Sequence, residues 1–316
     1  MRGKLLGQRG PVKRATVGAA FLGIAGFAAG IGCGGTPQQV RPPDPYQSRI
    51  TNCIGSARNL SDAAQAAMVA IPAGVATLGS TEAERVQARR DYGAGGEQLF
   101  RDEQETHQVQ LSGFRIDPTP VTNAAYAEFV EACGALPPDA ETLTPEFWQA
   151  NQERYGVAAN FSDIQRFIWP GQKPERARAR HPAVLVTRDQ AGFYCAWRGG
   201  RLPSEVEWER AARGPGGYIY PWGNRYDAFR VYSRVRGAVD TNEVGVLTSG
   251  DTPEGLHGMG GHVFEWTSTP YPGVSDAFVA KGNGFGMTGG YGRGAARVPR
   301  AGDIRDIRLG FRCAAD

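Results

Sequence analysis

The chain has little of three things that would indicate a function: charge of one sign, histidine and cysteine. It holds 35 basic against 32 acidic residues, and five of the basic ones fall within residues 1–32, which contain no acid. The remainder carries 30 basic and 32 acidic side chains, a net charge of −2, so nothing in its bulk charge indicates a nucleic-acid partner. The four histidines are scattered and supply no His-rich metal segment.

A long, strongly apolar run is also missing. A membrane-spanning helix needs about 20 such residues, whereas the uncharged stretch Ala15–Val40 is rich in Gly and Ala, with an apolar centre at Phe21–Ala29. Basic residues before a short apolar stretch and small residues after it are typical of a secretory signal peptide. We therefore expect residues 1–32 to be a signal peptide and the protein to be exported.

Cys33 directly follows this stretch, in a pattern that resembles a bacterial lipobox with Gly30 where Leu is usual. Lipidation of Cys33 would anchor the mature protein to a membrane, and Gly34 after it favours the outer membrane if enteric-type sorting applies. Residues 33–60 would then form a Pro- and Gln-rich tether and linker. Ordinary secretion and a retained N-terminal helix are the alternatives.

The chain has only five cysteines, and none lies between Lys281 and Arg312. Lipidation would use one of the five and leave four, which allow three disulfide pairings in an oxidising compartment. Buried free thiols are the alternative. The five are Cys33, Cys53, Cys133, Cys195 and Cys313.

Glycine, in contrast, is abundant: the 44 glycines are roughly twice the average share of about 7%. Because glycine supplies turns and close backbone approach, we expect modest helix, short strands and long loops. No fixed-period repeat is present. The run Gly282–Gly294 lacks the Lys-Ser/Thr pair and the following helix of a phosphate-binding loop.

Local signals place the expected elements. Residues 68–74 are expected to form a strand and turn that continues at 78–80, and residues 107–116 a strand pair, because apolar side chains alternate in 107–116. Thr122 should cap a helix ending near Cys133, Asp189 should cap the next one, and Ser204 with Glu207 forms a capping box that starts a third. Residues 81–105 are expected to be an exposed loop, and residues of about 137–180 an irregular insertion.

Several motifs together resemble the formylglycine-generating enzyme family, also called the sulfatase-modifying factor domain. The resemblance covers nearly the whole mature chain, so residues 61–316 are expected to form the domain. It implies an α+β, irregular, C-type-lectin-like fold with little regular secondary structure and many loops. The motifs are MVAIPAG (68–74), DPTPVTNAAYAEFV (117–130), YCAW (194–197), GRLPSEVEWERAARG (200–214), YPWG (220–223), HVFEWT (262–267) and LGFRCAAD (309–316).

The resemblance also implies a disulfide. In the family, the cysteine of the Tyr-Cys-x-Trp helix pairs with the cysteine of the terminal Gly-Phe-Arg-Cys motif, and these correspond here to Cys195 and Cys313. We predict that pair together with Cys53–Cys133.

The chemistry of the family depends on two other cysteines. Its enzymatic members oxidise a substrate cysteine with O2 and copper held by two thiolates, in a segment that reads Gly-Gly-Ser, two residues, Cys, four residues, Cys. Here the segment opens at Lys281, and the two cysteine positions hold Met287 and Gly292. A thioether binds Cu(I) weakly and has no proton to lose, and glycine offers no ligand. The sequence therefore predicts no catalytic residue and no copper.

Calcium is the other family cofactor, and its site is weakened too. The resemblance places Gly258 and Glu265 at two calcium-ligand positions, which leaves only Glu265 as a candidate, whereas Ca²⁺ takes six to eight oxygens. We assign His257 and His262 a structural role, since their spacing defines no metal geometry. We interpret the acids of the third helix, Glu205, Glu207 and Glu209, as capping and surface charge.

Two groups of side chains could bind a ligand. The resemblance places Phe285, Met287, Tyr291 and Arg293 where the family binds its substrate, so a groove without its chemistry is expected there. A second group of aromatic side chains lies in the insertion and forms either a recognition surface or part of the packing. It consists of Trp148, Tyr155, Phe161, Phe167 and Trp169.

Two functions follow from the resemblance. The first is a non-catalytic binding or scaffold lipoprotein of the bacterial cell envelope, which would recognise a protein, peptide or glycan through the groove. The second is an enzyme: a formylglycine-generating oxidase with relocated ligands, or a divergent metal-dependent oxygenase acting on a protein or small molecule. Copper content and O2 consumption distinguish them.

Overall fold

The structure, a computed structural model, describes residues 45–56, 66–92, 100–139, 141, 143–155, 159–234 and 237–316. The predicted signal peptide and Cys33 lie outside those residues. All described residues belong to one compact unit, Pro43–Asp316. Among them, no helix is both long and apolar enough to cross a membrane.

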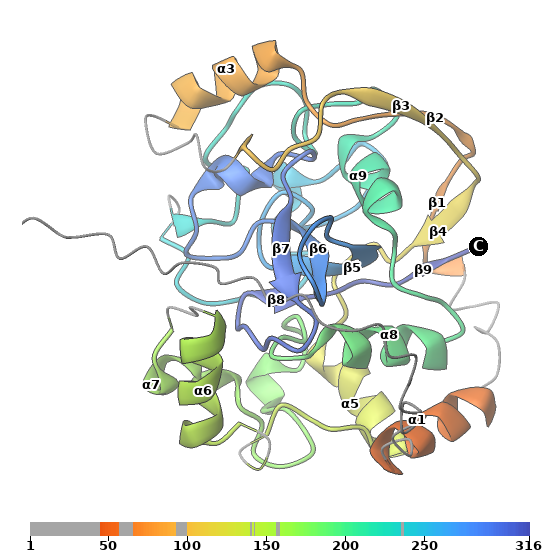
Figure 1. Cartoon of the computed structure of the whole chain (residues 1–316), viewed down its shortest axis with the longest axis vertical. Helices are drawn as coiled ribbons and strands as arrows, with labels where there is room; N and C mark the ends of the chain where they lie inside the picture. Colours follow the sequence, from red (N-terminus) through yellow and green to blue (C-terminus); the bar gives the residue numbers. More distant parts are fainter. Residues whose placement is uncertain are drawn as a thin grey trace, which may run out of the picture. The chain divides into compact units, whose positions relative to one another are not determined.

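Helices and short strands alternate along the chain (Figure 1). The helices are α1 (Pro45–Ser56), α3 (Glu82–Tyr92), α5 (Asn123–Cys133), α6 (Pro145–Tyr155), α7 (Phe161–Ile164), α8 (Arg188–Trp197) and α9 (Glu205–Arg213). The strands are β1 (Val69–Ile71), β2 (Gly74–Leu78), β3 (His107–Leu111), β4 (Phe114–Ile116), β5 (Phe264–Pro270), β6 (Ala277–Gly282), β7 (Val298–Ala301), β8 (Leu309–Gly310) and β9 (Ala314–Ala315).

The strands form three small sheets, in the orders β1-β4-β9, β2-β3 and β7-β6-β5-β8. Strands β5 and β6 are antiparallel, with Phe264 opposite Gly282, and β8 runs parallel to β5 with Leu309 opposite Phe264. The parallel pairing brings the last residues of the chain beside the buried strand β5. These short strands and long connections confirm the predicted irregular α+β fold.

Two of the three predicted helix starts are confirmed. The Thr122 hydroxyl accepts a hydrogen bond from the backbone N–H of Ala125 at the start of α5, and Ser204 and Glu207 form the capping box of α9. The third is wrong, because Thr187, two residues before Asp189, is the N-cap of α8. Thr187 forms its own capping box with Gln190, which leaves Asp189 in the first turn.

Three segments predicted to be irregular are helical. Helix α1 lies in the predicted linker, but Ile50 is fully buried and a disulfide joins Cys53 to the end of α5. Helix α3 occupies residues 82–92 of the predicted loop at 81–105, and its buried Arg85 donates to the backbone oxygen of Ser80 and pairs with Glu105. The predicted irregular insertion holds α6 and α7, where buried Trp148 helps form the core.

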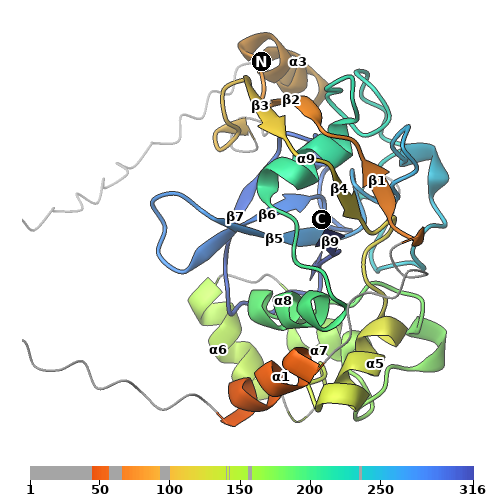
Figure 2. The same ribbon diagram turned by 90° about the vertical axis from the view of Figure 1, so that its right-hand side faces the viewer.

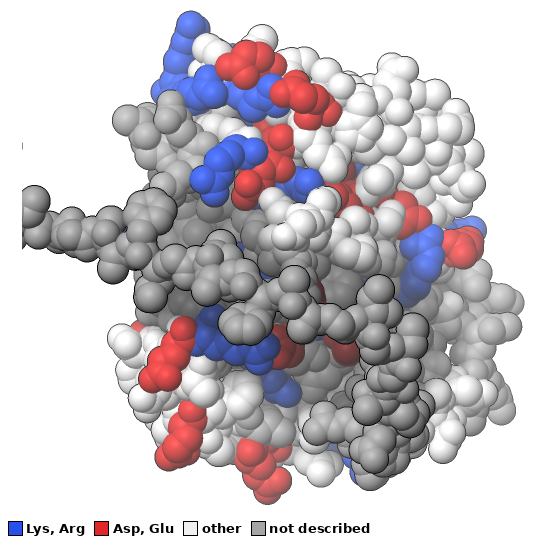
Figure 3. All heavy atoms as spheres, in the orientation of Figure 1, with Lys and Arg blue, Asp and Glu red and all other residues white. Residues whose placement is uncertain are grey.

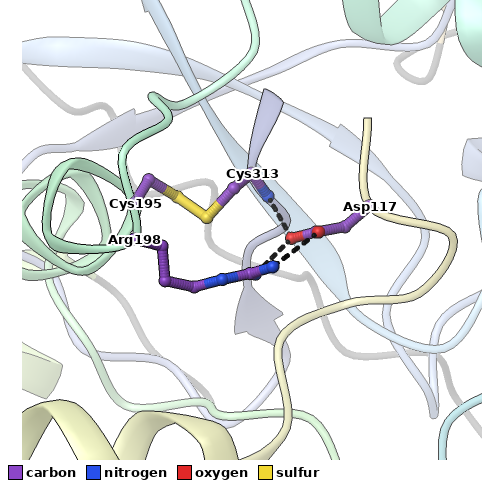
Figure 4. The surroundings of a disulfide bond; sticks show 4 residues. All are labelled: Asp117, Cys195, Arg198 and Cys313. Carbon is purple, nitrogen blue, oxygen red and sulfur yellow. Dashed lines mark hydrogen bonds and ion pairs between the residues drawn. A yellow bond between two sulfur atoms is a disulfide. The ribbon is translucent and has the colours of Figure 1, made fainter. Parts of the chain in front are cut away.

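Helix packing positions the central sheet (Figure 2). Helices α1, α5 and α8 contact one another, α8 packs on β5, and α9 lies between β2 and the strands β5 and β6. The Cys195–Cys313 disulfide joins α8 to the chain end (Figure 4). Beside it, the Asp117 carboxylate accepts from the backbone N–H of Cys313 at 3.0 Å and pairs with Arg198 at 2.9 Å. Both predicted disulfides are confirmed.

Candidate functional site

The segment that carries the chemistry in the family lies between β6 and β7. Among its predicted groove residues, Phe285 is buried and stacks on Phe167, with ring centroids 5.9 Å apart. Arg293 is 2% exposed, and its guanidinium forms a bidentate ion pair with Glu103 at 2.8 and 3.1 Å. These two side chains therefore hold the segment in place.

Met287 and Tyr291 are the other two predicted groove residues, and both are partly exposed. The backbone N–H of Met287 donates to the oxygen of Gly284, and a short helical turn at Gly289–Gly292 carries Tyr291. The groove stays a prediction, with Met287 and Tyr291 as the side chains that reach its surface.

Neither of the two positions where the family has its copper-binding cysteines can supply a thiolate here. An Arg308 Nη1–H donates to the sulfur of Met287 at 3.3 Å, which places a positive charge beside the first position. At the second position, a Cβ added to Gly292 would lie 2.5 Å from the backbone oxygen of Gly260. Neither position offers a soft anionic ligand, and the second has no room for any side chain.

No other thiol in the described part of the chain compensates. Its four cysteines form Cys53–Cys133 and Cys195–Cys313, and the fifth, Cys33, lies outside the described residues. Because Cu(I) in this family is held by two thiolates, the donor set of the domain does not fit that ion.

Glu265, the predicted calcium ligand, is fully buried and already neutralised. Its carboxylate accepts from Arg312 Nε at 2.7 Å and Nη2 at 2.8 Å, and from the indole N–H of Trp208 at 2.7 Å. Arg312 also donates to the backbone oxygens of Asp117 and His257. Both carboxylate oxygens of Glu265 are thus engaged by Arg312, which disfavours Ca²⁺ binding there, and its role as a calcium ligand stays a prediction.

The predicted surface charge of α9 is wrong at two positions. Glu205 and Glu209 lie four residues apart, on one buried face of the helix, and both meet Lys281 of β6, at 3.8 and 2.9 Å. Arg297 donates to Glu205 at 2.9 Å, and Arg213 pairs with Glu209 at 3.1 Å. Burial would raise the pKa of Glu209, but Lys281 and Arg213 outweigh it and hold the pKa below its usual range.

The two histidines near Glu265 have structural roles. His262 is buried, and its Nε2 accepts from the backbone N–H of Asn242 at 3.0 Å; burial lowers its pKa to about 4. His257 Nδ1 lies 2.7 Å from a carboxylate oxygen of Asp251. Throughout the described ranges, no three His, Cys, Asp or Glu side chains gather in a way that could hold a metal ion.

The aromatic side chains of the insertion mostly pack. Trp148, Phe167 and Trp169 are buried in the main core, and Phe161 packs partly against it. The Tyr155 side chain lies outside what the structure describes. For three of the five, therefore, the packing interpretation is confirmed.

Sequence reasoning missed the residue that most changes the site, Arg308. The only signal was its position directly before the LGFRC motif, where the chain returns beside β5. It also missed Lys281 as the partner of two buried acids, because those acids lie 72 and 76 positions earlier in the sequence.

Comparisons with known proteins agree with this fold. Residues 56–316 match the family model for the sulfatase-modifying factor enzyme 1-like domain. The inactive C-alpha-formylglycine-generating enzyme 2 of Mus musculus is 32% identical over 297 residues, which cover 81% of this chain and 88% of that protein. The formylglycine-generating enzyme of Streptomyces coelicolor is 32% identical over 259 residues, 68% of this chain and 82% of that enzyme.

Among solved structures, PvdO from Pseudomonas aeruginosa aligns with a TM-score of 0.57 and 23% identity, covering 78% of this chain and 93% of that one. This likeness supports the fold alone. Family model, relatives and fold agree over nearly all of the domain, and the chain belongs to the sulfatase-modifying factor family.

Proposed function

We propose that this protein is a non-catalytic binding or scaffold lipoprotein of the bacterial cell envelope. One observation carries the proposal: where the family places its two thiolates, this chain has a thioether bonded to Arg308 and a glycine without room for a side chain. A cation beside Met287 would also repel a copper ion electrostatically. A relative from Mus musculus, 32% identical, is itself named inactive, which supports a non-catalytic role within the family.

The binding role follows from what the segment keeps. Phe285 and Arg293 hold its backbone through buried contacts, while Met287 and Tyr291 still reach the surface. A loop held from beneath and partly exposed above suits recognition of a protein, peptide or glycan.

Turnover is the test of the non-catalytic role. Purified protein is incubated with copper, O2 and a Cys-x-Pro-x-Arg peptide, and the peptide mass and O2 uptake are followed. The Streptomyces coelicolor enzyme serves as positive control. We expect no conversion beyond that of a blank without protein. Conversion of the thiol to an aldehyde would contradict the proposal and favour a formylglycine-generating oxidase or a metal-dependent oxygenase.

The envelope location rests on the N-terminal pattern and has its own test. We expect intact-mass analysis of protein from bacterial membranes to show a diacylglycerol-modified Cys33 as the first residue. The Cys33→Ala variant should lose both the lipid mass and the membrane association. If both proteins fractionate with the membrane equally and neither carries lipid, the anchor is wrong while the binding role stands.

A further inference from the structure

A pocket lies next to Met287, where the C-terminal end of α6 meets β7 and the loop after it. Its lining includes Arg300 and Arg308, which lie eight positions apart, and Arg154 from a distant part of the chain. Figure 3 shows basic side chains, with acidic ones beside them, where α6 approaches the strands β7 and β8. No sequence motif brings these residues together.

The charges of the pocket do not cancel. Arg154 pairs with Asp303 at 2.9 Å and Arg308 with Asp306 at 3.2 Å. Among the residues that the structure describes, no carboxylate oxygen lies within 4.0 Å of Arg300. One positive charge is therefore in excess, and it belongs to Arg300.

Arg300 is held in place with donors to spare. Its Nη1 donates to the backbone oxygen of Pro299 at 3.0 Å, and its guanidinium lies over the ring of Phe264, 5.4 Å from the centroid. Its guanidinium makes no other hydrogen bond within the described ranges, and Arg300 is one of the residues that line the pocket. Burial lowers the pKa of Arg300; the negative charge of Asp306 opposes this shift, and the positive charge of Arg308 adds to it.

The pocket borders the predicted groove. Arg308 reaches from the pocket to the sulfur of Met287, and the ring of Phe264 under Arg300 meets the ring of Tyr291 edge-on at 5.5 Å. The rest of the wall includes the acid Asp306, which pairs with Arg308, and the apolar side chains Val274 and Ile304. A ligand lying over Met287 and Tyr291 could therefore place a charged group in the pocket.

We propose that the pocket binds a carboxylate of a peptide ligand, with Arg300 as the primary contact. This inference rests on the proposed binding function. A guanidinium fork matches the two oxygens of a carboxylate. One surplus positive charge neutralises one negative charge, which a carboxylate carries, whereas a phosphate monoester carries nearly two at pH 7. The apolar side chains of Val274 and Ile304 in the wall favour an organic ligand over an inorganic anion.

The test is a titration of the whole folded domain, in low salt, with a short peptide that has a free C-terminal carboxylate. Binding is followed by NMR of the arginine side chains, which detects millimolar affinities. We expect saturation, with the signals of Arg300 shifting most. The same peptide as a C-terminal amide should bind at least about tenfold more weakly.

Variants assign the contact. Arg300→Gln should weaken binding of the free acid about tenfold or more, and Arg300→Lys should restore part of it, because the charge returns without the fork. Arg180→Gln, at an exposed arginine paired with Glu243, is the matched control and should bind as the parent does. Thermal unfolding shows that each variant is folded.

Three results would overturn the inference: no saturable binding up to about 10 mM peptide, equal binding of acid and amide, or unchanged binding by Arg300→Gln. Tighter binding of inorganic phosphate or sulfate than of the peptide would show a different anion site. Peptide turnover with copper, measured separately, would instead refute the non-catalytic function, so the two failures are distinguishable.

Discussion

Two charged regions lie on either side of the central sheet and differ in how completely their charges are paired. Around α9 and β6 the charges are buried and closed on one another, as in the pair Glu265–Arg312, whose side chains are fully buried. In the pocket beside β7, Arg300 is a lining residue and has no carboxylate oxygen within 4.0 Å among the described residues. A closed charge holds the fold, because removing one partner leaves the other unpaired in the interior. An open charge can serve a ligand.

Breaking the closed region should give the largest effect. Arg312→Met leaves Glu265 buried without its guanidinium, so we expect the free energy of unfolding to fall by about 3–5 kcal/mol. Denaturant unfolding measures the change, with Arg180→Met as an exposed control that should cost less than about 1 kcal/mol. The double variant Glu265→Gln/Arg312→Met should recover part of the loss, because no lone charge stays buried. A loss as small as the control's would show that the pair is not structural.

The disulfide beside this region should rank next. Cys195 and Cys313 lie 118 positions apart, and their bond ties α8 to the chain end that carries Arg312. Replacing both by Ala should cost about 2–5 kcal/mol of unfolding free energy. The measurement is thermal unfolding of the variant beside the parent, with and without reductant. Reductant should lower the unfolding midpoint of the parent by much more than it lowers the midpoint of the variant. Equal shifts would mean that the Cys195–Cys313 bond contributes nothing to stability.

His262 gives the closed region a pH dependence. Its pKa is about 4 in the folded protein against about 6.5 unfolded, because burial disfavours the charged ring. Between those values the unfolded chain binds more protons, so stability rises with pH from about 4 to about 6.5 and then levels off. The window corresponds to about 3 kcal/mol. Subtracting the pH profile of His262→Asn from that of the parent should isolate this slope, and a flat difference would contradict it.

Arg300→Gln should give the smallest change in stability and therefore sharpens the comparison most. Without an ion pair to lose, the variant forfeits mainly its contact with the ring of Phe264, so we expect a change below about 1 kcal/mol. Denaturant unfolding in parallel with Arg312→Met gives the contrast within one experiment. Equal losses in the two variants would mean that both regions are structural.

What the sequence predicted well was local. The N-caps at Thr122 and Ser204 depend on residues three positions apart, and such short patterns can be recognised in the amino-acid sequence alone. The family motifs extended this to the fold and to the pairing of Cys195 with Cys313. Asp189 shows the limit even there, because Thr187 two residues earlier made the better cap.

What the sequence did not predict was set by distant contacts. Glutamate is usually a surface residue, so Glu209 gives no local sign of burial. It is buried because it forms an ion pair with Lys281, 72 positions later. Arg154 and Asp303 meet across 149 positions, so the pocket beside β7 has no signature in either segment. Helix α6 was hidden because its low apolar content resembles that of a loop, although Trp148 anchors it in the core.

The most direct test of the central claim is an anaerobic Cu(I) titration of the protein with both disulfides intact, in competition with a chromophoric chelator. Because Met287 and Gly292 supply no thiolate, we predict that the chelator retains the copper at every ratio. One copper ion held per chain, and lost in the Met287→Leu variant, would contradict the account.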